Sequence, residues 1–512
     1  MKKLINKFGK IKTKPIVKSA MINIIVFIIL NLLSYSKFAC NIDIMMQSVI
    51  SNVYGGADAS YAIFMNIFIT KILKTLSEVC PAIAWYTILL VFICFVSLTL
   101  IGQRYLSEKS KKMHVVIYSV FCVFIGFECY IYPSYIKSAF VLCFSMLLQL
   151  AYMPETTKKK WLRLLGCVLG LLFSGMLSRT GFFFGVIIGV FYYLLTNTYR
   201  KRWDGKCIIQ VVTLIVSVWG VMILWGMNDK IYASHLENWD VIKENRNAIE
   251  KVEVFGYPDL TRDAQEKLGI SENQYDSIKE DDQYIAVETA GVELIKKISE
   301  EKMEWNVDSI IKYFHTVPVR WIKVSFTYLL LVVCIFLGES NADDKKKRII
   351  ISLAWIVISY LLSYMSGIWN SKATHFMIFI PIVYWTMCGI GEEFEVSVRE
   401  ACLFLTVFSV VLYYNFSDQF VSSVTEKSIE ETLDEMTLEG SVTAVDLNHL
   451  FGQYSTYKAY PKNLLIEKNI IVVNGNYGIY NNFEPYMYKQ VLWDVPIWWY
   501  GNWMDMDYYR IQ

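Results

Sequence analysis

A small set of charged side chains borders the apolar runs of this 512-residue sequence. Two carboxylates, Asp43 and Asp58, lie in the stretch that follows the first apolar run. The other candidates stand at the borders of later runs and are Glu128, Arg179, Lys372 and His375. Because ionisable residues are costly inside a bilayer, those at its boundary are candidates for a functional site.

Carboxylates and cations at one membrane face suit the transfer of a group from a lipid-linked phosphate. Arginine and lysine bind phosphate, and arginine does so through two parallel hydrogen bonds. We therefore expect Arg179, with Lys372 or His375, to hold the phosphate of a donor. Asp43 is expected to accept the proton of an acceptor hydroxyl, or to bind a divalent cation if one is used.

Each of these residues also has an ordinary structural interpretation. Asp43 can cap the helix that would begin at the following residue. Asp58 and Glu128 are expected as supporting acids, but Asp58 can occupy a turn after two glycines. Glu128 can instead form a structural pair with Arg179, and His375 can be an ordinary packed histidine. No residue is specific alone, and their expected position on one side of the membrane is what favours a functional site.

The composition indicates a membrane protein. Hydrophobic residues make up 55% of the chain and charged residues only 19%, against roughly 25% charged residues in soluble domains. We therefore expect an all-α polytopic membrane protein with about eleven, or alternatively twelve, transmembrane helices. The predicted spans are residues 19–35, 82–102, 113–131, 135–153, 161–177, 181–197, 207–226, 318–338, 349–368, 373–391 and 401–416.

Basic clusters predict the orientation of these spans. Several lysines precede the first apolar run, and four further basic clusters fall between later runs. They occupy residues 103–112, 154–163, 199–206 and 345–348. Because basic loops stay on the cytoplasmic side, we expect a multi-pass protein of the cell membrane. Its N-terminus is expected in the cytoplasm and its C-terminus outside.

The expected organisation has four regions. In chain order they are an N-terminal membrane domain at 1–226 with a first outer loop at 36–81, a mainly helical extracytoplasmic loop at 227–317, C-terminal membrane helices at 318–416, and a small extracytoplasmic α/β domain at 417–512. In the last region, Ser441–Val445 and Ile470–Val473 alternate as short strands do. A large outer loop and an outer domain are compatible with chemistry at the outer membrane face.

Two segments allow more than one interpretation. Residues 60–79 are apolar but contain two lysines, so we expect an interfacial or partly inserted helix in preference to a span. The aromatic residues of 496–503 are typical of an interfacial belt or a small core, and alternatively of a sugar-stacking platform. The eleven cysteines indicate no disulfide framework, although Cys40 and Cys80 could pair.

The first outer loop resembles that of a known group of enzymes. A first span, an outer loop with an early acid and many further spans resemble the GT-C superfamily of polyprenyl-phosphate-sugar-dependent glycosyltransferases. The loop also resembles bacterial multi-pass proteins that read Asn-Asp-Asp-x-x-Met and then Ser-Gly-x-Tyr-Thr-Gly-x-x-Asp. The matching residues are Asn41, Asp43, Met46, Tyr54, Gly56 and Asp58. Ile42 replaces the first acid of that pattern, and Asn52 replaces its first glycine.

The resemblance implies a membrane glycosyltransferase working at the outer face. It would move a sugar from a polyprenyl-phosphate donor to a cell-surface glycan, lipid or protein. Its partners would be that donor, membrane lipids and the acceptor, without nucleic acid. The sequence shows no glycine-rich phosphate loop, in agreement with a donor that contains no nucleotide. An optional divalent cation is the only cofactor expected.

Two other functions compete with this one. A polysaccharide polymerase or ligase would use the 227–317 loop, with Arg246 and Arg262 contacting an anionic lipid. A transporter or flippase is disfavoured, because the sequence shows no pair of Gly/Pro-broken spans in matching halves. Dependence on Asp43 would favour the transferase, and dependence on Arg246 would favour the polymerase.

Overall fold

The architecture is that of a computed structural model. It describes residues 14–53, 62–108, 112–152, 160–200, 206–235, 239–255, 260–273, 296–301, 331–333, 342–365, 372–389, 442–445, 454–464, 470–472 and 497–500, together with residues 275, 294, 311 and 451.

Six helices of the described chain are long and apolar enough to cross a membrane. They are α2 (Pro15–Leu33), α5 (Trp85–Glu108), α6 (Lys112–Gly126) with the π-helix η1 (Phe127–Ile131) that continues it, α8 (Lys160–Leu177), α9 (Arg179–Arg200) and α10 (Lys206–His235). Each corresponds to one predicted span. The membrane region is therefore all-α and multi-pass, as the hydropathy of the sequence predicted.

Three other predicted spans correspond to helices that are shorter or begin with charged residues. They are α7 (Tyr135–Ala151), α17 (Ala342–Met365) and α18 (Lys372–Met387). The predicted spans at 318–338 and 401–416 lie almost entirely outside the described residues. The total of about eleven spans therefore remains a prediction.

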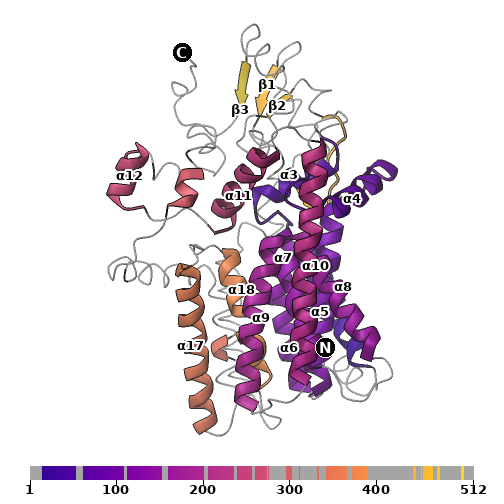
Figure 1. Ribbon diagram of the computed structural model, residues 1–512. Coiled ribbons are helices and arrows are strands. Elements are labelled where there is room, and N and C mark those ends of the chain that lie inside the picture. The colour runs from indigo at the N-terminus through magenta and orange to yellow at the C-terminus, as the bar shows by residue number, and fades with distance from the viewer. Residues whose placement is uncertain are drawn as a thin grey trace.

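Successive helices of the bundle run in opposite directions (Figure 1). The two ends of the bundle differ in composition. At one end, called the basic end, lie the lysine- and arginine-bearing ends of α5, α9, α10 and α17. There Arg104 Nε donates to Gln149 Oε1 on α7 at 2.7 Å. The opposite end, called the polar end, carries α3 (Asn41–Ile50), α4 (Ile67–Val79) and α11 (Trp239–Phe255).

Helix α4 is the segment for which an interfacial position was predicted. It has 13 residues, or about 20 Å of length, whereas a bilayer core is roughly 30 Å thick. Its Ile72 and Val79 side chains are exposed, while Ile69 and Leu73 are buried. Asn66 caps it by accepting a hydrogen bond from the Phe68 amide at 3.2 Å. This geometry agrees with a short amphipathic helix at the end of the bundle.

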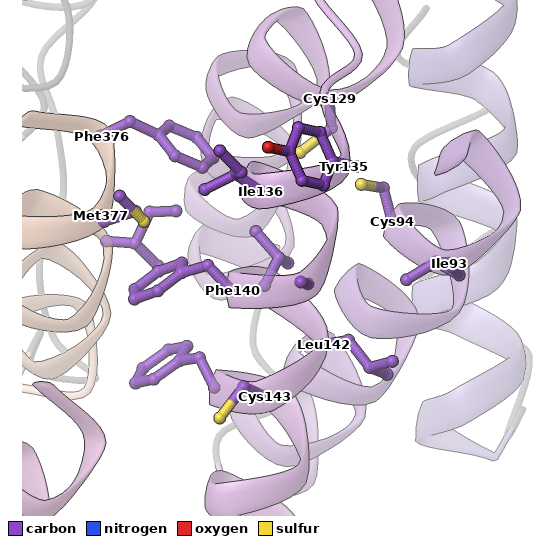
Figure 2. Close-up of a cluster of buried hydrophobic side chains, with 14 of the residues drawn as sticks. Ile93, Cys94, Cys129, Tyr135, Ile136, Phe140, Leu142, Cys143, Phe376 and Met377 are labelled. Atoms are coloured by element: carbon purple, nitrogen blue, oxygen red, sulfur yellow. The ribbon is translucent and has the colours of Figure 1, made fainter. Parts of the chain in front are cut away.

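Helix α7 is the centre of the bundle and packs against α5, α8 and α9. Its side chains are buried over most of its length, and Figure 2 shows several of them between α5 and α18. Gly181 of α9 is needed for one close contact, because a Cβ there would lie 2.5 Å from the Ile136 carbonyl oxygen. The tight packing fixes the start of α7, which faces the polar end.

Three short strands are described in the C-terminal part. They are β1 (Val442–Val445), β2 (Ile470–Val472) and β3 (Ile497–Tyr500), and they form a parallel sheet in the order β2-β1-β3. The first two were predicted as strands. The aromatic residues of 497–500 form the third strand, an arrangement that the sequence did not predict. Whether the region is a separate α/β domain remains a prediction.

Residues 454–464, called the C-terminal strap, lie against the polar end of the bundle. The Thr456 amide donates to the Ser36 carbonyl at 3.1 Å, and its carbonyl accepts from Thr87 Oγ1 at 2.6 Å. The Tyr457 hydroxyl donates to the backbone of η1 at 3.0 Å. These contacts close the loop between α2 and α3 with a segment from the far end of the sequence.

Candidate functional site

Asp43 lies at the polar end, enclosed between α3, α5 and the start of α7. Its Oδ1 accepts hydrogen bonds from the Tyr86 hydroxyl at 2.6 Å and from the Tyr135 amide at 3.0 Å. Its Oδ2 accepts from the Cys40 thiol at 2.9 Å. The side chain is fully buried. Asp43 therefore joins three elements of the bundle rather than facing solvent.

The environment of Asp43 has a clear electrostatic consequence. Burial raises the pKa of its carboxyl group from 3.8 to about 6, because the charged form loses its hydration, while the donated hydrogen bonds oppose this rise. The capping interpretation is wrong, since α3 begins at Asn41 and the N-cap position is Cys40. A carboxylate inside the first turn still interacts favourably with the helix dipole.

Glu128 is paired with a lysine of α7 and not with Arg179. Lys137 Nζ lies 2.6 Å from Glu128 Oε2, and both side chains are buried. The ammonium group also faces the rings of Tyr132 and Phe376. The structural ion pair of Glu128 is therefore formed with Lys137 and not, as had been predicted, with Arg179. Lys137 was not considered because it lies inside an apolar run of the sequence.

A pocket of about 420 Å³ opens at the polar end between α9, α10 and α11. Its lining residues are Phe64, Arg179, Thr180, Phe183, Phe184, Ile187, Trp225, Arg246, Asn247, Glu250 and Lys251. We call it the cationic pocket. It contains the predicted phosphate ligand Arg179 and two further cations from α11.

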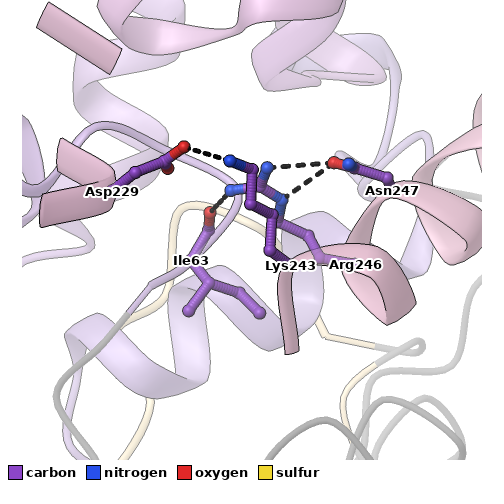
Figure 3. Close-up of polar contacts among 5 residues, drawn as sticks. All are labelled: Ile63, Asp229, Lys243, Arg246 and Asn247. Carbon is purple, nitrogen blue, oxygen red and sulfur yellow. Dashed lines mark hydrogen bonds and ion pairs between the residues drawn. The ribbon is translucent and has the colours of Figure 1, made fainter. Parts of the chain in front are cut away.

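Arg246 is the buried cation of this pocket, with 3% of its surface exposed. Figure 3 shows its guanidinium group donating to the Ile63 carbonyl at 3.3 Å and to Asn247 Oδ1 at 2.9 Å and 3.3 Å. The rings of Trp225 and Trp239 lie at 5.6 Å and 5.7 Å from the guanidinium carbon. Aromatic faces stabilise a cation that burial would otherwise disfavour.

Glu250 connects the pocket to the Asp43 environment. Its Oε1 accepts a hydrogen bond from the Tyr135 hydroxyl at 3.1 Å, while the amide of the same tyrosine binds Asp43. Burial raises the pKa of Glu250, and the positive charge of Arg246 opposes that rise. Tyr135 thus holds one carboxylate by its backbone and another by its side chain.

Arg179 stands at the exposed rim of the pocket and begins α9. Its guanidinium group lies 6.0 Å from the centre of the Phe183 ring. Its side chain is exposed, and its positive charge acts on the carboxylate of Glu250. The structure therefore brings Arg179 together with Arg246 and Glu250, and links these to Asp43 through Tyr135.

The remaining predicted residues are placed only in part. Asp58 lies outside the described residues. Lys372 and His375 belong to the first turn of α18, but the description does not extend to their side chains. Where the chain is described, no group of three His, Cys, Asp or Glu side chains is arranged to hold a metal ion. Cys40 and Cys80 do not form the disulfide that the sequence allowed.

Glu250 and Lys251 were missed by the sequence argument, and Arg246 was assigned only to the polymerase alternative. A signal for them exists, because Arg246 and Glu250 are four residues apart and share one face of a helix. Ile242 precedes them at the same spacing and is buried. A charged pair in line with a buried isoleucine indicates that the charges face the protein.

Comparison with protein-family models, curated proteins and solved structures found no match for this chain.

Proposed function

We propose that this protein is a membrane glycosyltransferase that takes its sugar from a polyprenyl-phosphate donor at the polar end of the bundle. The observation that carries the proposal is the cationic pocket, in which Arg179, Arg246 and Lys251 stand beside the carboxylate of Glu250. Cations bind the phosphate of a lipid donor, and a carboxylate within reach accepts a proton. The pocket provides both groups at the end of the transmembrane helices.

In the proposed reaction Glu250 is the general base. It accepts the proton of the acceptor hydroxyl as the oxygen forms a bond to the anomeric carbon of the sugar. The bond from that carbon to the phosphate breaks, and the polyprenyl phosphate leaves with the bonding electrons. Arg179 and Arg246 stabilise the charge that develops on this leaving group.

Asp43 has a different part in this proposal from the one its position in the sequence suggested. It does not line the cationic pocket, and its oxygens already accept hydrogen bonds from Cys40, Tyr86 and Tyr135. We assign it a positioning role, in which it fixes the start of α7. The hydroxyl of Tyr135 is thereby directed at Glu250.

The orientation of the protein belongs to the same proposal. If the basic end faces the cytoplasm, the cationic pocket opens in the outer half of the membrane. A chain of about eleven spans would then place the C-terminal strands outside. Alkaline phosphatase fused at the end of the chain would be active in that arrangement and inactive in the opposite one.

A polysaccharide polymerase or ligase is the second candidate, and Arg246 favours it. The polymerase alternative assigned Arg246 a contact with an anionic lipid, and the side chain does lie in the cationic pocket. Both functions use a lipid-linked phosphate as the leaving group, so the pocket alone does not separate them. The size of the group that is transferred separates them.

The test is transfer by the purified protein in liposomes. The protein is supplied with a radiolabelled polyprenyl-phosphate sugar and with acceptors extracted from the cell envelope. Transfer of a single sugar supports the glycosyltransferase, and joining of whole repeat units supports the polymerase. Retention of all label on the donor, with binding of the donor also absent, would contradict both.

A further inference from the structure

The cationic pocket has more positive charge than its own carboxylate balances. Arg179 and Arg246 each contribute a guanidinium group, which carries a positive charge in proteins. Lys251 is a third cation of the lining, and Glu250 is the one acid among the lining residues. The Nζ of Lys251 donates to a backbone carbonyl, which leaves its charge without compensation from that contact.

The charges just outside the lining leave this excess in place. Asp229 forms an ion pair with Lys243 (Figure 3), so the two cancel. Glu300 interacts with Lys251 from an exposed position, where solvent screens the interaction. The lining therefore contains three cations against the one carboxylate of Glu250, and a ligand has to balance the excess positive charge.

Arg246 has hydrogen-bonding capacity left for such a ligand. The guanidinium group has five N–H donors, and its recorded bonds to the described residues use three of them. Its position is fixed by two tryptophan rings and by the Ile63 carbonyl. A fixed, buried guanidinium group with free donors is well suited to the planar, bidentate recognition of an oxyanion.

The walls of the pocket are apolar on the side of α9. Phe183, Phe184 and Ile187 continue the lining along this helix from Arg179, and Ile187 has 58% of its surface exposed. A free inorganic anion would gain nothing from these side chains. A ligand whose anionic group is esterified to an apolar alcohol would bury that alcohol against them.

We propose that the cationic pocket is a site for the dianionic phosphate monoester of a lipid alcohol, and that it binds this monoester more tightly than a phosphate diester of the same alcohol. The proposal rests on the transfer function proposed above. There, the donor is a diester with one negative charge, and the leaving group is a monoester with about two. The pocket would thus fit the product side of the reaction and favour departure of the phosphate.

The experiment measures binding to the full-length protein in detergent micelles at pH about 7.5, above the second phosphate pKa of about 6. The probes are geranyl phosphate, its methyl diester and inorganic phosphate. We expect the monoester to bind about tenfold or more tightly than the diester, because it adds one charge beside two arginines. We expect inorganic phosphate to bind more weakly than geranyl phosphate, because it lacks the apolar part.

Two variants test the arginines. Arg246→Gln should reduce monoester affinity to that of the diester. Arg179→Gln should produce the same direction of change and, being at the exposed rim, puts folding at little risk. Lys267→Gln on α12 (Arg262–Leu268) is the control, because that lysine is an exposed cation and lies outside the pocket. The control variant should bind the monoester as tightly as the wild-type protein does.

Equal binding of monoester and diester by the wild-type protein would overturn the proposal. So would inorganic phosphate binding as tightly as geranyl phosphate, since the lipid part would then contribute nothing. These failures are separate from failure of the proposed function. Sugar transfer with equal affinities would contradict only the preference for the monoester. A preference for the monoester without sugar transfer would contradict only the proposed enzymatic function.

Discussion

Tyr135 lies between Asp43 and the cationic pocket. The protein hydrogen-bonds the carboxyl group of Asp43 internally, whereas it leaves an excess of positive charge in the pocket. Asp43 is fully buried, and both its oxygens accept hydrogen bonds. In the pocket, Arg179 is exposed and Arg246 keeps donors that its contacts with the described residues leave unused. A charge that the protein satisfies internally stabilises structure, whereas a charge left unbalanced in a cavity requires a ligand.

The largest expected effect separates the two carboxylates by activity. Glu250→Gln keeps the shape of the side chain and removes its basicity, so we expect a loss of transfer on the order of 10²–10⁴-fold. Asp43→Asn should cost much less, because asparagine can still accept from Tyr86 and Tyr135. The measurement is the initial rate of sugar transfer in liposomes at matched protein content. A larger loss in Asp43→Asn than in Glu250→Gln would reverse the assigned roles.

The second prediction concerns stability and tests whether Asp43 is as enclosed as the structure shows. Its pKa of about 6 lies above the ordinary value of 3.8, so the folded state holds the proton more tightly than the unfolded state. The free energy of unfolding should therefore fall as the pH rises through the window from about 4 to 6, by about 3 kcal/mol in total.

Thermal unfolding in detergent across this pH range measures the effect. Asp43→Asn has no proton to lose, so its curve should lack that fall. Gln265 on α12 offers no such titration, and Gln265→Asn serves as a control for a distant polar change. If wild type and Asp43→Asn show the same pH dependence, the fall comes from other groups and Asp43 is solvated.

The sequence predicted the membrane helices better than it predicted the site. Apolar runs and basic clusters are properties of single segments, and they located six spans correctly. The predicted partner of Glu128 was wrong, because its actual partner Lys137 lies inside a run whose average hydropathy is apolar. Glu250 was missed because its importance comes from Tyr135, more than a hundred residues earlier. Such pairings depend on how α7 and α11 pack, which no local pattern shows.

The smallest expected effect concerns Tyr135, which connects the two regions. Tyr135→Phe removes the hydrogen bond to Glu250 and keeps the backbone bond to Asp43. That hydrogen bond lowers the pKa of Glu250, so its loss should raise this pKa further. Glu250 acts as a base only when ionised, and the acidic limb of the pH–rate profile should therefore move to higher pH.

Above that limb the transfer rate of Tyr135→Phe should fall by about tenfold, since the loss of one hydrogen bond to a charged group costs about 1.5 kcal/mol at the low end of its usual range. Tyr86→Phe is the matched control, because it removes a tyrosine hydroxyl that donates to Asp43 and leaves the contacts of Glu250 unchanged. Its acidic limb should not move. A shift of equal size in both variants would mean that Asp43, and not Glu250, sets the limb, and the comparison between the two regions would fail.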